Sequence, residues 1–215
     1  MTNTRRIQIV VGLLLSLGVA LLPLGNWGRA HSGFGKLLGG EVLWWVAVVV
    51  VLLYVGFVEW RRFGSIGFRP PKLMDIVLAA VAGILMVVGI VVIYQIVFPL
   101  FHLKMNAGEM NSLLQTPFWY RVILVTRAAV AEELLFRGYP IERIGELSGS
   151  LVVASVVSWA AFTYAHLASW GAAQLIVAGY GGLVLTALYL WRRNLWANML
   201  AHWIADGAGF LLPHG

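Results

Sequence analysis

The chain has 215 residues, of which 60% are hydrophobic and only 11% are charged. A soluble domain carries about 25% charged residues. This composition therefore excludes a soluble globular protein and indicates one integral membrane domain over residues 1–215. The sequence contains no cysteine, which excludes disulfides, thiolate nucleophiles and cysteine-based metal sites.

The net charge of +6 suggests nucleic acid as a partner at first sight, but the positions of the positive residues argue against it. They flank apolar runs, as positive residues that set membrane orientation do. The residues concerned are Arg5, Arg6, Arg61, Arg62, Arg69, Lys72, Arg192 and Arg193. We therefore expect no nucleic-acid partner.

Seven apolar runs predict membrane helices, which need about 20 mostly apolar residues. They cover residues 7–25, 42–59, 75–100, 117–136, 150–168, 171–190 and 195–212. The first run follows two arginines and resembles a signal peptide, but it is longer than a typical signal core, so we expect an uncleaved helix. The predicted fold class is an all-α, polytopic membrane bundle. An eighth span stays open, because helices with polar faces are easily miscounted.

The loops predict the orientation of this bundle. The amino end and residues 59–72 are both rich in arginine, and two predicted helices separate them. Both can therefore lie in the cytoplasm, since cytoplasmic loops carry the excess of positive charge. The loops on the opposite side carry fewer positive residues. We expect an integral protein of a prokaryotic plasma membrane with its amino end cytoplasmic.

The segment VTRAAVAEELLFRGYP places charged residues inside a predicted span. A charge at the membrane centre costs roughly 3 kcal/mol or more. On an α-helix Glu133 and Arg137 are four residues apart and share a face, whereas Glu132 is turned about 100° away. Glu133 thus has a partner in its own helix and Glu132 does not. Desolvation favours the neutral form of an unpaired carboxyl group, so Glu132 could act as a general base for water.

Two less specific interpretations of this segment stay open. Both glutamates could form an ion-pair network that ties this helix to its neighbours. The charge of Arg127 lies in the same span and needs an anionic partner that the sequence does not identify, so a structural ion pair is the better interpretation there.

Two further polar faces occur in predicted spans. His166 lies one turn after Phe162 in SWAAFTYAHL, and Asn198, His202 and Asp206 form a stripe at four-residue spacing in NMLAHWIADGAG. Alone, the histidine could be a packing residue, and the stripe could hold helices together by hydrogen bonds. Taken with the paired glutamates in so short a chain, they favour a catalytic site.

The rise along each helix predicts the depth of this site. Glu132 lies about 20 Å and His166 about 25 Å from the 146–149 turn, and His202 lies about 10 Å from the start of the last span. These heights agree if the 140–149 hairpin projects roughly 10 Å into the cytoplasm. The site is then expected a little below the cytoplasmic surface.

The motifs EELLFRG, FTYAH and HWIAD, in that order, resemble those of the CPBP family. This family comprises type II CAAX prenyl endopeptidases and bacteriocin-processing or abortive-infection proteins. The resemblance covers roughly residues 117–212, the motif-bearing core, whereas residues 1–105 match only as generic hydrophobic spans.

The resemblance implies an intramembrane glutamate-type endopeptidase without a cofactor. Glu132 would activate a water that His166 helps to hold, and His202 and Asp206 would face the scissile carbonyl oxygen. Glu133, Arg137, Phe162 and Asn198 would support them. Where the family often has Asn, this chain has Asp206, which must be protonated to face an oxyanion or must instead orient His202. We add from helical spacing that Asn198 could supply a donor amide. The implied partners are membrane lipid and a peptide or protein substrate, membrane-associated or lipidated.

Three other functions stay open. Glu132, His166, His202 and Asp206 are all potential zinc ligands, although the HExxH helix of many zinc proteases is absent. A non-catalytic membrane scaffold or immunity protein would use the same fold without chemistry. A transporter could relay protons through intramembrane His and Glu, but the two halves show no paired broken helices.

Overall fold

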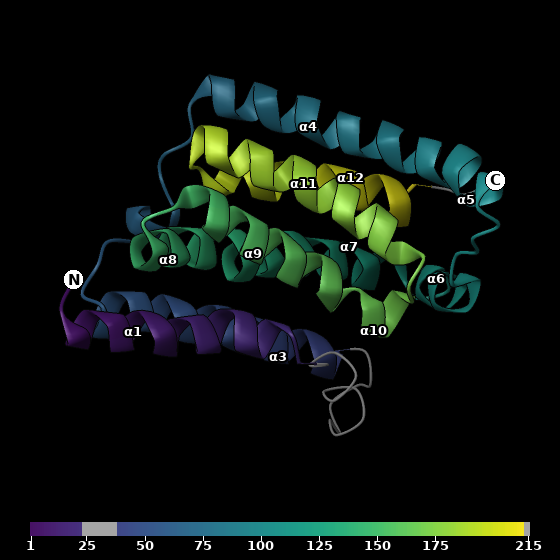
Figure 1. Ribbon diagram of the computed structural model, residues 1–215. Coiled ribbons are helices and arrows are strands. Elements are labelled where there is room, and N and C mark those ends of the chain that lie inside the picture. Colours follow the sequence, from purple (N-terminus) through teal and green to yellow (C-terminus); the bar gives the residue numbers. More distant parts are fainter. Residues whose placement is uncertain (23–37, 213–215) are drawn as a thin grey trace.

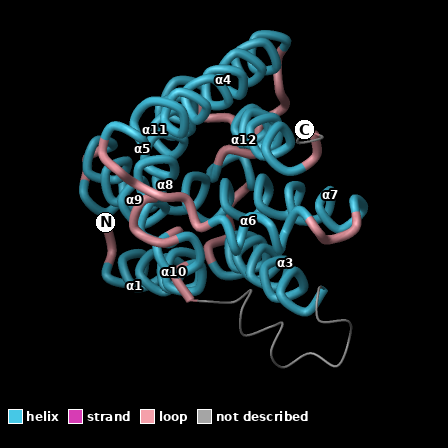
Figure 2. Tube along the Cα trace, turned by 90° about the vertical axis from the view of Figure 1, so that its right-hand side faces the viewer, coloured by secondary structure: helices cyan, strands magenta, loops and turns pink. Residues whose placement is uncertain are grey.

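The computed structural model describes residues 1–22 and 38–212, and this part of the chain is entirely helical apart from turns and loops. The helices run nearly parallel along one axis (Figure 1), and Figure 2 shows them almost end-on. In chain order the elements are α1 Asn3–Leu13, η1 Leu14–Gly18, α3 Leu38–Leu53, η2 Tyr54–Val58, η3 Phe63–Ile66, α4 Leu73–Val92, η4 Ile93–Val97, α5 Phe98–Leu100, α6 Ala107–Leu114, α7 Phe118–Arg127, η5 Ala128–Gly138, α8 Tyr139–Ser148, α9 Leu151–Ala165, α10 Leu167–Trp170, α11 Gln174–Arg192 and α12 Leu195–Phe210.

The helices form layers around the continuous segment α7–η5–α8. In Figure 1 this segment and α9 occupy the middle, α4 lies outermost on one side with α11 and α12 beneath it, and α1 and α3 lie on the other side. The side chains of Leu134, Leu135 and Phe136 are buried at the centre of the main apolar cluster. The layers therefore enclose η5, which carries the paired glutamates.

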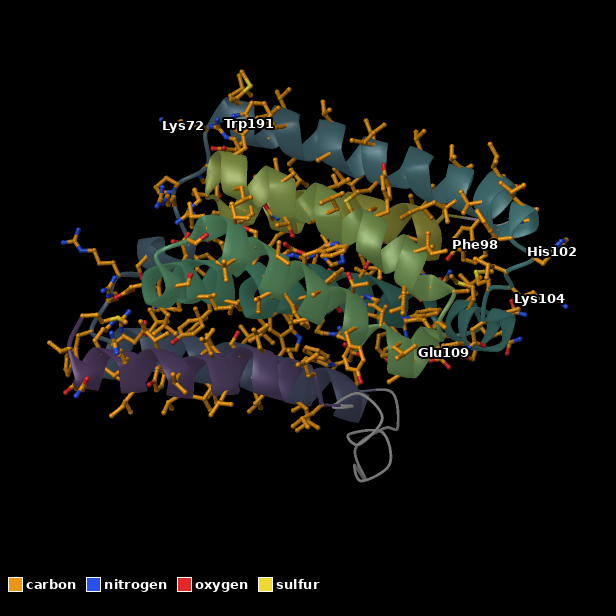
Figure 3. All side chains as sticks on the ribbon, viewed as in Figure 1. Lys72, Phe98, His102, Lys104, Glu109 and Trp191 are labelled. Carbon is orange, nitrogen blue, oxygen red and sulfur yellow. The ribbon has the colours of Figure 1, made fainter. Side chains whose placement is uncertain are left out.

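The outer surface is apolar, as a surface that faces lipid must be. The exposed apolar side chains of α4 are Leu73, Met74, Ile76, Val77, Val81, Ile84, Leu85, Val88, Val91 and Val92. Exposing these apolar side chains to water is unfavourable, whereas the hydrocarbon core of a membrane accommodates them. Charged and interfacial residues gather at the two ends instead: Figure 3 shows Lys72 and Trp191 at one end and His102, Lys104 and Glu109 at the other.

Four helices of the described part are long and apolar enough to cross a membrane: Leu38–Val58, Leu73–Leu100, Leu151–Trp170 and Gln174–Arg192. The other three expected spans are helical too, at 3–18, 118–148 and 195–210. The last two carry Glu132, His202 and Asp206, and the third helix of the predicted site, with His166, is Leu151–Trp170. Residues 23–25 of the first expected span lie outside the described part.

A network of ion pairs ties the helices together at the end where the chain begins. The buried carboxylate of Glu59 accepts hydrogen bonds from Arg143 at 2.6 Å, from Arg5 at 3.0 Å and from Tyr139 at 3.0 Å. Arg143 and Tyr139 belong to α8 and Arg5 belongs to α1, so one carboxylate joins elements that are far apart in the sequence. A buried charge is tolerated when it is paired in this way.

Glu146 belongs to the same network. Arg5 donates to its two carboxylate oxygens at 2.8 and 2.9 Å, and this hydrogen bonding by a cation lowers the pKa of Glu146 below its ordinary value. A carboxyl group with a lowered pKa stabilises the fold above its unfolded pKa, and the contribution is lost as the pH falls through the folded value. The attachment of α1 to α8 is therefore strongest near neutral pH and weakens in acid.

We expect Arg143→Met to lower the free energy of unfolding by about 3 kcal/mol, because it leaves the Glu59 carboxylate buried without its main cation. Arg61→Met is the matched control, since the Arg61 side chain is 41% exposed and its ion pair is worth less than about 1 kcal/mol. Denaturant titration in mixed micelles, followed by circular dichroism, measures both. Equal losses in the two variants would contradict this account of the network.

Candidate active site

One cavity collects the four side chains that the sequence predicts as catalytic. Glu132 from η5, His166 at the end of α9, and His202 and Asp206 from α12 all line it. Its volume is about 350 Å³, within the range of roughly 300–1,000 Å³ typical of ligand sites. Three helices that are distant in sequence thus bring titratable groups to a single internal space.

The segment that carries the glutamates is not an α-helix. Residues Ala128–Gly138 form a π-helix, in which backbone hydrogen bonds join residues five apart. Hydroxyl groups of neighbouring helices help to satisfy its backbone: Ser16 donates to the carbonyl of Leu135 at 2.6 Å, and Ser158 donates to that of Phe136. The wider helix changes which side chains share a face.

Glu132 is paired, contrary to the expectation from α-helical geometry. Arg127, five residues earlier, donates from Nη1 to Glu132 Oε1 at 3.2 Å. The same guanidinium donates from Nε to Glu41 Oε2 at 2.7 Å, so the anionic partners that Arg127 needs are Glu41 and Glu132. Among the described residues Glu132 Oε2 accepts no hydrogen bond, and this oxygen can accept one from a molecule in the cavity.

Glu133 is fully buried and has no access to the cavity. It accepts from Arg137 Nη1 at 2.9 Å, as its four-residue spacing predicts, and it contacts His202 Nδ1 at 2.8 Å. Asn198 Nδ2 donates to its other oxygen at 3.1 Å. Three partners hold this carboxylate in place, so Glu133 is a structural centre that joins η5 to α12.

The donor role suggested above for Asn198 does not fit this geometry. Its amide nitrogen donates to Glu133 and, at 2.7 Å, to the carbonyl of Leu185. The residue is fully buried and does not line the cavity. Asn198 therefore supports Glu133 instead of facing a substrate.

Phe162 organises the aromatic wall beside these charges. The guanidinium of Arg137 lies 3.7 Å from the centroid of its ring, a cation–π contact in a buried setting. The same ring lies 4.6 Å from the imidazole of His166, so Phe162 and His166 share a face as predicted. Phe162 thus separates the buried cation from the cavity and packs against one of its histidines.

The hydrogen bonding of His166 determines its tautomer. Its Nδ1 lies 2.8 Å from the carbonyl oxygen of Phe162. A carbonyl only accepts, so Nδ1 carries the proton and Nε2 of the neutral ring has a free lone pair. His166 lines the cavity and can therefore present a hydrogen-bond acceptor there.

His202 lies between two carboxylates. Its Nδ1 faces Glu133 at 2.8 Å and its Nε2 faces Asp206 Oδ2 at 3.4 Å. Both ring nitrogens donate only in the imidazolium form, so the two carboxylates favour a cationic ring. Of the two roles left open for Asp206, this contact fits the one that orients His202.

The described residues contain no group of three or more His, Asp or Glu side chains arranged to hold a metal ion. His202 already uses both nitrogens on protein carboxylates, and His166 uses one on a backbone carbonyl. The four residues proposed as zinc ligands share a cavity without forming such a group.

The cavity extends away from the arginine-rich end of the bundle, which the sequence predicts to be cytoplasmic. Its lining includes Glu109 of α6 and Trp170 of α10, and Figure 1 places both helices at the opposite end. His202 lies near the middle of α12. The site is thus central, and the cavity extends away from the arginine-rich end.

Glu41 is the residue that sequence reasoning missed. It lies in α3, is 4% exposed and accepts from Tyr120 at 3.1 Å as well as from Arg127. It is the one acidic residue of the run GGEVLWWVAVVV, and a lone carboxylate at the start of an apolar helix was the available signal. Nothing in the sequence pairs it with a residue 86 positions later.

Comparison with protein families matches residues 113–208 to the family described as Rce1-like, type II CAAX prenyl endopeptidase. The comparison with curated proteins and the comparison with solved structures each gave no match. The matched segment contains all four cavity-lining residues predicted as catalytic, whereas Glu41 lies outside it.

The different burial of the two glutamates predicts different stabilities for their amide variants. Glu133→Gln should lower the free energy of unfolding by about 3 kcal/mol, because the fully buried Arg137 loses its counter-charge. Glu132→Gln keeps an acceptor for Arg127, which retains Glu41, and should cost about 1 kcal/mol. Denaturant titration of both proteins in the same micelles tests this; a larger loss for Glu132→Gln would reverse the roles assigned to the two residues.

Proposed function

Since residues 113–208 belong to the Rce1-like family of type II CAAX prenyl endopeptidases, we propose that this membrane protein hydrolyses a peptide bond with a water activated by Glu132. One observation carries the proposal: Glu132, His166, His202 and Asp206, from three helices, line the same cavity. Members of the family are proteases, and this cavity holds the groups that hydrolysis needs.

The attacking water would be held between Glu132 and His166. Glu132 Oε2 is the carboxylate oxygen without a protein partner among the described residues, and His166 Nε2 is the free ring acceptor. As the water oxygen bonds to the scissile carbonyl carbon, one of its protons passes to Glu132. The carbon–nitrogen bond then breaks, and that proton goes to the departing amine. This is general base and then general acid catalysis by one group.

His202 would stabilise the negative charge that develops on the carbonyl oxygen. Its imidazolium form is favoured by Glu133 and Asp206. A fixed cationic donor that faces a developing oxyanion in a low-dielectric pocket strongly stabilises the transition state. The contact from Nε2 to Asp206 is long, at 3.4 Å, so the same N–H can turn to an incoming oxygen. Asp206 then balances the charge of the ring and does not bind the oxyanion.

The lining of the cavity defines the kind of substrate. Apolar side chains such as Met86, Ile90 and Val177 surround the polar groups, and about 350 Å³ accommodates a few residues of an extended peptide. We place an apolar, membrane-associated or lipidated peptide segment there. With the amino end in the cytoplasm and seven spans, the segment enters from the non-cytoplasmic side, toward which the cavity extends.

We expect Glu132→Gln and His166→Ala each to reduce cleavage by at least about 10³-fold, since each removes a group that handles the water. Glu146→Gln is the matched carboxyl-to-amide control, because Glu146 lies at the other end of the bundle. Mass spectrometry identifies the peptides released from membranes of cells that express each protein. These peptides identify the substrate, and their amounts measure the loss of cleavage. Full activity in either site variant would show the assignment of the base to be wrong.

The same variants separate an enzyme from a scaffold or immunity protein. If Glu132→Gln and wild-type protein yield identical sets of membrane peptides, and the variant keeps its effect on the host, the protein acts by binding and not by hydrolysis.

Metal chelation distinguishes the proposed mechanism from that of a zinc protease. Activity of the purified protein on an identified peptide should be unchanged after prolonged treatment with 1,10-phenanthroline, because the proposed reaction uses only side chains. Loss of activity that returns on addition of Zn²⁺ would instead assign Glu132, His166 and His202 to a metal.

A further inference from the structure

We propose that Glu41 and Arg127 are positioning residues for Glu132: Glu41 holds the guanidinium that fixes one oxygen of Glu132 and shares its charge. The inference rests on the proposed function, in which Glu132 is the base. It assigns a role to a residue of α3, outside the segment that matches the family, and to an arginine that the three sequence motifs do not include.

The geometry of this chain of charges is specific. Arg127 Nε donates to Glu41 Oε2 at 2.7 Å, and Arg127 Nη1 donates to Glu132 Oε1 at 3.2 Å. The three side chains are 11%, 5% and 14% exposed for Arg127, Glu41 and Glu132 respectively. The two atoms of one planar guanidinium therefore fix the relative positions of carboxylates on α3 and η5.

Two more contacts hold the assembly in place. Tyr120 donates to Glu41 Oε1 at 3.1 Å, and the guanidinium carbon of Arg127 lies 5.2 Å from the centroid of the Trp44 ring. The contact with Glu41 is shorter than the contact with Glu132, so Glu41 is the stronger anchor. Arg127 is consequently placed by α3 and then places Glu132, a residue that lines the cavity.

The shared charge predicts opposite effects of variants of Glu41 and of Arg127. One positive charge serves two carboxylates, so Glu132 receives only part of its effect. Without Glu41, the guanidinium of Arg127 pairs with Glu132 alone, which favours the ionised form of Glu132. Removing Arg127 takes away the cation that contacts Glu132 and favours its protonated form. A merely structural role predicts no such opposite effects.

Other charged groups face the same space and stay constant across the variants. Glu109, His166, His202 and Asp206 line the cavity with Glu132, and Arg137 lies close enough for an electrostatic effect. Their influence on Glu132 is the same in wild type and in variants of Glu41 or Arg127, so a difference between these proteins reports the ion pair.

The test is an infrared titration of the purified full chain in nanodiscs. The carboxyl band of Glu132 is the band lost in Glu132→Gln, and its intensity is followed against pH. We expect its midpoint to fall by about one pH unit in Glu41→Gln and to rise by about one unit in Arg127→Gln, each a tenfold change in proton binding. Glu146→Gln and Arg61→Gln, at the other end of the bundle, should leave it unmoved.

If a single variant fails to fold, the double variant Glu41→Gln/Arg127→Gln is used, because it removes both charges of the buried Glu41–Arg127 pair together. The midpoint of Glu132 should rise in this protein. Midpoints that stay in place, or that move in the same direction in both single variants, overturn the proposal. The titration needs no substrate, so it can fail while hydrolysis by Glu132 stands. The proposed function can likewise fail in the peptide comparison while the titration succeeds.

Discussion

The pairing of charges inside an apolar bundle is the constraint on which the rest of this structure depends. A charge removed from water is tolerated only when a counter-charge and hydrogen bonds replace the water. The buried carboxylates described here meet this condition: Glu59 has Arg143 and Arg5, Asp75 has Arg192, and Glu133 has Arg137. The pairs of Glu59 and Asp75 join helices that are distant in sequence, whereas Glu133 and Arg137 lie in the same helix and Glu133 reaches α12 through His202.

The same constraint gives the adjacent residues Glu132 and Glu133 different roles. Glu133 uses both oxygens on Arg137, Asn198 and His202 and has no access to the cavity, whereas Glu132 uses one oxygen on Arg127 and lines it. Successive side chains point in different directions on any helix, which separates their surroundings, and the contact at five-residue spacing adds Arg127 as a partner of Glu132. A structural carboxylate and a chemically available one can thus occupy successive positions.

Much of this arrangement was predictable from the sequence, and the exceptions have physical causes. The four-residue spacing of Phe162 and His166 and of His202 and Asp206 predicted real contacts, because such neighbours meet on an α-helix. The contact of Glu133 with Arg137 was predicted too and is present although this segment is a π-helix. The expectation that Glu132 has no partner in its own helix was wrong, because the π-helix brings together residues five apart, here Arg127 and Glu132. Glu41 was not found because its contact with Arg127 depends on how two helices pack, and local periodicity contains no information about that.

The central claim is that side chains of three helices act on one substrate in one cavity. A structure of the Glu132→Gln protein with a bound peptide substrate tests it most directly. The account predicts the scissile carbonyl in the cavity, its oxygen within hydrogen-bond distance of His202 and a water between residue 132 and His166. A peptide bound outside this cavity, or a carbonyl oxygen turned away from His202, would contradict it.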